Sequence, residues 1–163
     1  MFARHFIDSL EFARNGRELR GEMAVAEMPR LQDLLAAPEG KIGYVVRGYQ
    51  DKSGEPMLQV EMDGSCRLAC QRCLSGFDYP VHLVSRLLLA QESELEMFSA
   101  EEDGPDRIFA DQHLDVAALL EEELLLSLPF APMHPPGACQ LAAKGLEQPG
   151  NAAFAVLAGL KDR

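Results

Sequence analysis

The chain has 163 residues, of which 47% are hydrophobic and 25% are charged. This is the composition of a soluble globular protein, and the length favours a single domain with its own core. The formal net charge of −11 excludes a protein that binds nucleic acid through a broadly basic face, because its mean field repels phosphate. The chain contains no run of about eighteen or more apolar residues, so no transmembrane helix is predicted. The first residues lack the layout of a secretory signal, so we expect a cytoplasmic protein.

Two short helices are expected on either side of the first strand. Asp8 can cap a helix in which Glu11 is the returning acid. Residues 18–28 then alternate between apolar and polar side chains, which predicts a strand with one solvated face. Pro29 suits the first turn of a second short helix, where its missing N–H would have no partner anyway.

Three long strands are predicted between residues 42 and 90. The β-branched and aromatic run 42–50, a polar turn and the regular alternation of 57–70 together predict an antiparallel hairpin. After another turn, residues 79–90 continue as a third strand. One face of each strand is apolar, so these faces should line the core.

The second half of the chain begins with an acid-rich segment, residues 91–106, which we expect to be a solvated loop. A short strand should follow at 107–110. Asp115 can cap a helix that runs to about Ser127 and presents a stripe of apolar side chains. Glu121 and Glu122 are expected on the solvated face of that helix.

These elements predict an α+β fold. We expect a curved or barrel-like antiparallel sheet of four to five strands with short helices packed on it, because the strands follow one another through short turns. Residues 1–130 should form this domain. Residues 131–163 are rich in proline and glycine and should form an extended tail that ends in a short helix.

The strongest chemical signal is a pair of cysteines, Cys70 and Cys73, separated by two residues. Two thiolates at this spacing can face one metal ion, and zinc in structural sites takes four such ligands. A second pair with four intervening residues, His134 and Cys139, lies far along the chain. The sequence therefore predicts a knuckle-like zinc site with these four residues as ligands.

Cys66 also belongs to this part of the chain but is not expected to bind the metal. In a regular strand its Cα atom would lie about 13 Å from that of Cys70, at about 3.3 Å per residue. Two sulfurs that far apart cannot share one tetrahedral ion. We therefore predict that Cys66 is a small core residue.

Two other interpretations of the cysteine pair remain open. Both thiols can simply be buried, or Cys70 and Cys73 can form a thiol-based redox pair. A thioredoxin-like pair needs a helix N-terminus after a parallel strand, whereas these cysteines follow an antiparallel strand. We therefore prefer the metal site to the redox pair.

No catalytic set accompanies these cysteines. The chain has no nucleophile elbow, phosphate-binding loop, dinucleotide fingerprint or zinc-protease motif. His5, His82 and His113 are isolated from one another. The three consecutive glutamates 121–123 point in different directions on a helix and favour a solvated face over an acid cluster.

Three segments together resemble a known bacterial family. They are residues 68–74 (LACQRCL), residues 115–129 (DVAALLEEELLLSLP) followed by His134 and Cys139, and residues 151–161 (NAAFAVLAGLK). Their joint occurrence resembles the large ribosomal RNA subunit accumulation protein family, YceD. The resemblance extends over nearly the whole chain, and by position it matches Cys70, Cys73 and Cys139 to the shared cysteines.

The resemblance implies a ribosome-biogenesis factor that acts in the synthesis, processing or stability of 23S rRNA without enzymatic activity. The acidic surface favours a basic ribosomal protein or an rRNA-processing enzyme as the partner. rRNA itself is the alternative, through a local site near Arg67 and Arg72. We expect no small-molecule substrate and no membrane contact.

Overall fold

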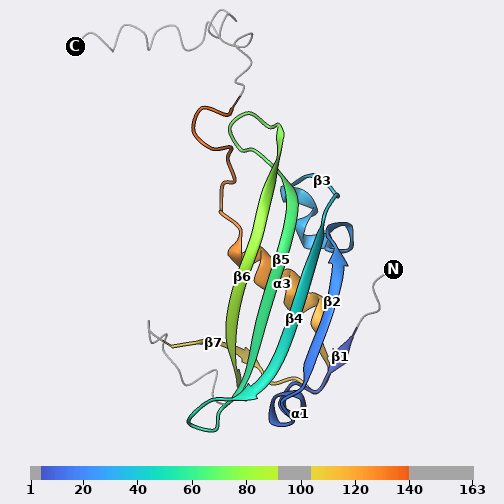
Figure 1. The fold of residues 1–163 in the computed structure, drawn as a ribbon, viewed down its shortest axis with the longest axis vertical. Helices are drawn as coiled ribbons and strands as arrows, with labels where there is room; N and C mark the ends of the chain where they lie inside the picture. Colours follow the sequence, from blue (N-terminus) through green and yellow to red (C-terminus); the bar gives the residue numbers. More distant parts are fainter. Residues whose placement is uncertain (1–4, 92–103, 140–163) are drawn as a thin grey trace, which may run out of the picture.

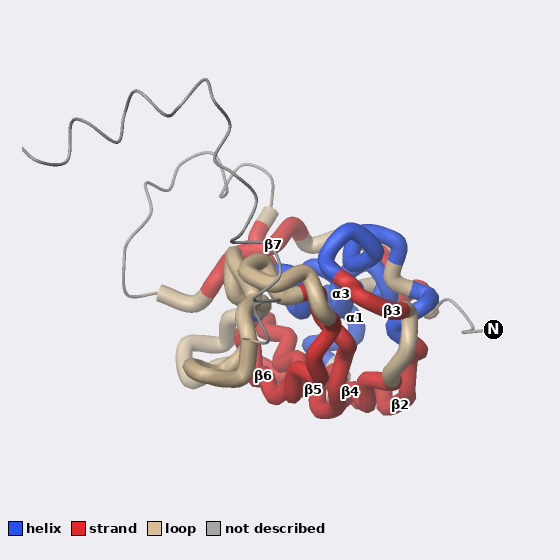
Figure 2. Tube along the Cα trace, turned by 90° about the horizontal axis from the view of Figure 1, so that it is seen from above, coloured by secondary structure: helices blue, strands red, loops and turns tan. Residues whose placement is uncertain are grey.

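The protein is a mixed α+β structure built on one six-stranded, mostly antiparallel sheet. The computed structural model describes residues 5–91 and 104–139. The helices lie together on one face of the sheet and leave the other face open (Figure 2). The elements in chain order are β1 (Phe6–Ile7), α1 (Ser9–Arg14), β2 (Glu18–Ala24), η1 (Val25–Glu27), η2 (Pro29–Leu34), β3 (Leu35–Ala37), β4 (Lys41–Gln50), β5 (Pro56–Ala69), β6 (Gly76–Ala90), β7 (Asp106–Phe109), β8 (Leu114–Asp115) and α3 (Val116–Ser127).

The three long strands β4, β5 and β6 form the centre of the sheet, as the alternation predicted (Figure 1). β5 pairs antiparallel with both neighbours, so that Gln59 lies opposite Arg47 on β4 and Arg86 on β6. The apolar faces of the strands are buried beneath the helices. This core includes Ile42, Val46, Leu58, Val60, Met62, Leu68 and Leu87.

Helix α1 is capped as predicted and packs closely against β4. The side chain of Asp8 accepts a hydrogen bond from the backbone N–H of Glu11 at 2.9 Å. A Cβ atom at Gly48 would lie 2.5 Å from the backbone oxygen of Phe12. Only glycine therefore allows the helix to approach the strand this closely.

The strand that was predicted at residues 18–28 is shorter in the structure. Residues 18–24 form β2, but residues 25–27 turn into the short 3-10 helix η1, and the second short helix, η2, is also 3-10. The alternation of residues 18–28 does not reveal this bend. Val25 and Met28 are buried after the strand has ended, so tertiary packing here overrides the strand pattern.

The expectation of a curved or barrel-like sheet of four to five strands is wrong in the shape of the sheet and in the number of its strands. The sheet is neither closed nor curled, and it has six strands in the order β2-β4-β5-β6-β7, with β3 also paired to β5. β7 pairs parallel to β6, whereas a fully antiparallel sheet was expected. A parallel pair needs a long crossover, which residues 91–105 are long enough to provide. β1 pairs with β8 in a separate ribbon.

Helix α3 crosses the covered face of the sheet and corrects the expectation for Glu121. Asp115 caps the helix as predicted, since its side chain accepts from the N–H groups of Ala117 and Ala118. Glu121 is buried rather than solvated, because its carboxylate accepts a 2.6 Å hydrogen bond from the backbone N–H of Arg30. Glu122 does face solvent.

Two predicted segments fall largely outside the described residues. They are most of the acid-rich loop 91–106 and the tail from residue 140 with its terminal helix. Within the described ranges, no helix combines the length and the apolar character that a membrane crossing requires.

Candidate metal centre

The first two predicted ligands stand on a tight turn at the end of β5. Cys70 follows Ala69 directly, and its backbone N–H donates to the carbonyl of Ser75 at 3.0 Å. The N–H of Leu74 donates back to the carbonyl of Cys70 at 2.8 Å, and Leu74 has a positive φ of 60°. These bonds reverse the chain into β6 and hold both cysteines on one turn.

The other two predicted ligands lie on residues 131–139, which have neither helix nor strand in the structure. This segment follows α3 and passes beside the turn between β5 and β6 (Figure 1). Its carbonyl at Pro132 accepts the N–H of Gln71 at 2.9 Å. Ala138 donates to the carbonyl of Pro135, with Pro136 and a positive-φ Gly137 between them, the sequence that a type II turn favours. The turn brings Cys139 back toward His134.

Four ligand atoms meet where these two segments touch. The sulfurs of Cys70, Cys73 and Cys139 and a ring nitrogen of His134 all lie within 4.8 Å of one another. The Sγ atoms of Cys70 and Cys139 are 3.6 Å apart, and Nδ1 of His134 lies 3.4 Å from Sγ of Cys73. A tetrahedral zinc site with Zn–S bonds of about 2.3 Å places its sulfurs about 3.8 Å apart. The donor set and its spacing therefore fit one zinc ion.

The surroundings of the cluster favour the thiolate form of Cys70. Burial disfavours its ionisation, but the backbone N–H groups of His134, Cys73 and Arg72 donate to the sulfur and lower the pKa of Cys70 to about 5. The pKa of Cys139 is raised, first by burial and then by the neighbouring thiol groups of Cys70 and Cys73. Several thiols at this spacing resist simultaneous ionisation, and a divalent cation would relieve that repulsion.

Cys66 lies apart from this cluster, as the strand geometry predicted. Its side chain is 2% exposed and packs in the hydrophobic core on the covered face of β5. Burial raises the pKa of the Cys66 thiol to about 11. It is therefore a neutral packing residue.

Of the two arginines that were predicted to contact RNA or a partner, Arg67 lies before the cysteine turn and Arg72 lies within it. Arg67 on β5 forms an ion pair with Asp78 on β6 at 3.3 Å, and both side chains are exposed. A guanidinium nitrogen of Arg72 lies 3.7 Å from the sulfur of Met133. Both arginines thus belong to the same end of the sheet as the cluster.

One residue of the site was missed at the sequence level. The ring of Phe77 packs against the imidazole of His134, with ring centroids 4.9 Å apart and a tilt of 40°. Phe77 lies in β6 at the first residues after the turn, opposite Leu68. Its place next to a turn that carries two cysteines was the available signal, but only the path of residues 131–139 shows which ring it supports.

The fold and the cluster define an α+β protein in which a sheet hairpin and a distant segment meet at a Cys3His cluster that could hold a metal ion. The family model of the large ribosomal RNA subunit accumulation protein YceD matches residues 58–161, more than half of the chain. The chain therefore belongs to the YceD family. Among solved structures, none matches this chain.

Proposed function

We propose that this protein acts in the cytoplasm as a non-catalytic factor that sustains the accumulation of the large-subunit rRNA, through the synthesis, processing or stability of 23S rRNA. The observation that carries the proposal is the match to the YceD family over residues 58–161. The matched region contains all four residues of the Cys3His cluster.

We further propose that zinc binds Cys70, Cys73, His134 and Cys139 and has a structural role. Four protein ligands close the coordination of a tetrahedral ion and leave no position for water or substrate, which is typical of structural sites. The ion would hold residues 131–139 against the turn after β5, where the bond between Gln71 and Pro132 already joins them. Metal binding would then contribute to the stability of the fold.

The proposed partner is a basic ribosomal protein or an rRNA-processing enzyme. The net charge of −11 favours association with a basic protein and speeds its encounter. Arg67 and Arg72 offer local positive charge beside the cluster, where rRNA itself can make contact.

The function is tested by deleting the gene and measuring the ratio of 23S to 16S rRNA in slow and fast growth. We expect the ratio to fall and to recover when the wild-type chain is returned. An unchanged ratio in both conditions would contradict the proposal. Affinity purification of the tagged chain from cells, followed by identification of the protein and RNA that accompany it, tests the partner.

A thiol-based redox role for Cys70 and Cys73 is the second candidate, and the closeness of their two sulfurs, which lie within 4.8 Å of each other, is the observation that favours it. Alkylation of the purified protein separates the two. A zinc site resists alkylation until a chelator removes the metal. The amount of zinc released should then be proportional to the number of cysteines that become reactive. A redox pair reacts without the chelator and forms a reversible disulfide.

A further inference from the structure

The open face of the sheet carries a row of polar side chains at the end away from the cysteine turn. Glu18 on β2 lies opposite Arg47 on β4, Arg47 lies opposite Gln59 on β5, and Gln59 lies opposite Arg86 on β6. Residues opposite one another in a sheet project their side chains on the same face. The strand register therefore gathers two arginines from separate strands at one level of the sheet.

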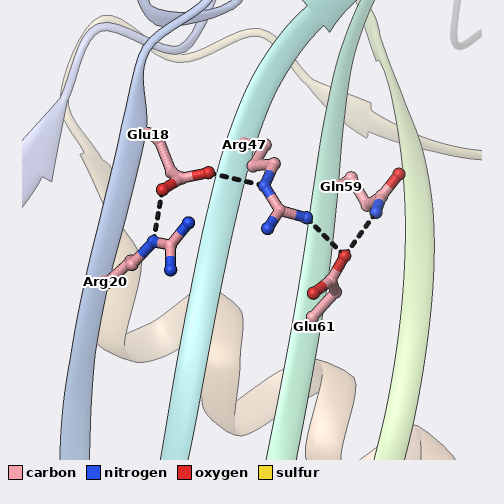
Figure 3. A network of polar contacts seen from close by, with 5 residues as sticks. All are labelled: Glu18, Arg20, Arg47, Gln59 and Glu61. Atoms are coloured by element: carbon pink, nitrogen blue, oxygen red, sulfur yellow. Dashed lines mark hydrogen bonds and ion pairs between the residues drawn. The ribbon is translucent and has the colours of Figure 1, made fainter.

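Ion pairs hold the middle of this row in place (Figure 3). Nε of Arg47 donates to Glu18 at 2.6 Å, and another guanidinium nitrogen donates to Glu61 at 2.5 Å. Glu61 also accepts from Gln59, and Glu18 accepts from Arg20. These contacts fix the plane of the Arg47 guanidinium while one of its terminal nitrogens makes no contact in this network.

Arg17 and Arg86 complete, with Arg47, a hollow of about 500 Å³ beside this network. It is lined by Arg17, Glu18, Arg47, Tyr49, Gln59 and Arg86, together with two glycines, and we call it the arginine pocket. Arg17 and Arg86 are exposed, and neither forms an ion pair with any residue in the described part of the chain. Tyr49 is half-buried and contributes an aromatic ring.

The charge of the arginine pocket opposes that of the whole protein. Its lining has three arginines and one glutamate, a formal charge of +2, whereas the chain carries −11. Arg17 and Arg86 lie beside the Arg47 guanidinium, which Glu18 and Glu61 hold in place, and guanidinium groups match the oxygens of a phosphate. An aromatic ring beside them matches the flat face of a base. The volume is within the range of about 300–1,000 Å³ that is usual for small-ligand sites.

We propose that the arginine pocket binds a nucleotide unit of single-stranded RNA, with the phosphate at Arg17, Arg47 and Arg86 and the base at Tyr49. This inference rests on the proposed function in rRNA accumulation and deepens it by locating a direct RNA contact. The contact is local, because the acidic remainder of the surface repels a longer stretch of phosphates. The pocket lies near the start of β5, at Gln59, whereas Arg67 lies near the end of this strand and Arg72 lies beyond it.

The test uses the full chain and a fluorescently labelled, short single-stranded RNA, with binding followed by anisotropy. The double variant R17A/R86A should lose affinity by about tenfold or more, since hydrogen bonds between charged groups are lost. The slope of log affinity against log salt should become shallower by about 0.7 for each phosphate contact removed. Tyr49→Phe should keep the affinity, and Tyr49→Ala should lower it by roughly tenfold.

The matched control is the double variant R30A/K41A. It removes the same charge from exposed side chains that lie outside the pocket and pair with Glu122 and Glu22. We expect its affinity and salt slope to stay close to those of the wild type. Equal losses in R17A/R86A and R30A/K41A would mean that only net charge matters and would overturn the proposal.

Competition distinguishes RNA from a free nucleotide as the source of the phosphate. Unlabelled RNA should displace the probe, whereas a nucleoside monophosphate should do so only at far higher concentration. Binding of the monophosphate without binding of RNA would overturn the RNA assignment. Wild-type affinity of R17A/R86A would overturn the pocket while leaving the proposed function intact, because that function is judged by the 23S to 16S ratio in cells.

Discussion

The two ends of the central sheet are built by different means. At the turn between β5 and β6, four ligand atoms from segments up to 69 residues apart come within 4.8 Å of one another. At the other end, the arginine pocket is assembled by the register of adjacent strands and stays exposed. The first site depends on where a distant segment lies, and the second depends on which residues of neighbouring strands face each other.

This difference determines how each end should respond to change. A metal centre with four ligands is cooperative, because losing one ligand releases the ion and the segment that it holds. Exposed ion pairs each contribute about 0–1 kcal/mol, so substitutions at the arginine end should leave the fold intact. Point substitutions at each end of the sheet test this contrast.

Cys70→Ser and Cys139→Ser should each abolish stoichiometric zinc binding, measured by elemental analysis of the purified chain. We expect the free energy of unfolding to fall by on the order of 3 kcal/mol or more, because binding free energies of structural zinc are larger still. Amide exchange should speed up in residues 131–139 and at Gln71. The amides of β4 beside the arginine pocket should keep their protection.

A wild-type protein that carries no metal and exchanges rapidly over residues 131–139 would contradict this account of the cluster end. The four residues would then be packing or redox residues, and the function would rest on the family match.

Cys66→Ala is the matched control, because Cys66 is a buried cysteine on β5, four residues before Cys70, and lies outside the cluster. We expect a loss of stability on the order of 1 kcal/mol from the small cavity left in the core and an unchanged zinc content. Chemical denaturation and elemental analysis measure the two effects. Loss of zinc in this variant would show that the core and the cluster are coupled more tightly than their separation indicates.

The arginine end should respond to acid through Glu18. Hydrogen bonds from Arg20 and then Arg47 lower the pKa of Glu18 from 4.5 to about 2. A carboxyl group whose pKa is lowered by folding stabilises the folded state at any pH above its pKa in the unfolded chain. This stabilisation is lost as the pH falls from 4.5 toward 2. Glu18→Gln should therefore flatten the decline in stability across that range, measured by denaturation at a series of pH values.

Glu123 on α3 gives the opposite sign and serves as the comparison. Burial is the main cause that raises its pKa above 4.5, and the nearby Asp106 and Glu122 carboxylates add to it. The contribution of Glu123 to the stability of the fold is fully present below the pKa of this group in the unfolded chain. It is lost as the pH rises through the pKa of the group in the folded chain. Glu123→Gln should thus gain relative stability toward neutral pH. Identical pH profiles for the two variants would contradict the separate environments of the two carboxyl groups.

The smallest effect is expected for Lys41→Ala. Lys41 pairs with Glu22 at 2.6 Å, but its side chain is 68% exposed, so water and salt screen the pair and its loss should barely change the stability of the fold. Thermal unfolding measures the change. A much larger loss would mean that the exposed ion pairs of the sheet act as a cooperative network.

Much of the local structure was predictable because its causes are local. The caps of α1 and α3 followed from Asp8 and Asp115, whose oxygens accept the free N–H groups of the first turn. The pairing of β4 with β5 followed from the alternation of their side chains. The four proposed metal ligands were selected from the types and spacing of their side chains. Cys66 was assigned to the core from strand geometry alone.

The remaining features escaped prediction because they arise from contacts between distant residues. The burial of Glu121 depends on the N–H of Arg30, a residue 91 positions away. The arginine pocket depends on Gln59 lying between Arg47 and Arg86, and shifting one strand by one residue would face its side chains to the other side. No local pattern encodes that register.

The long strands, the helix caps and the residues suited to bind a metal were predictable from the sequence, since periodicity and side-chain chemistry act over a few neighbouring residues. The open sheet, the parallel pairing of β7 and the return of residues 131–139 to the turn after β5 became known from the folded chain alone. These outcomes depend on contacts between residues that lie far apart in the sequence, which local patterns do not encode.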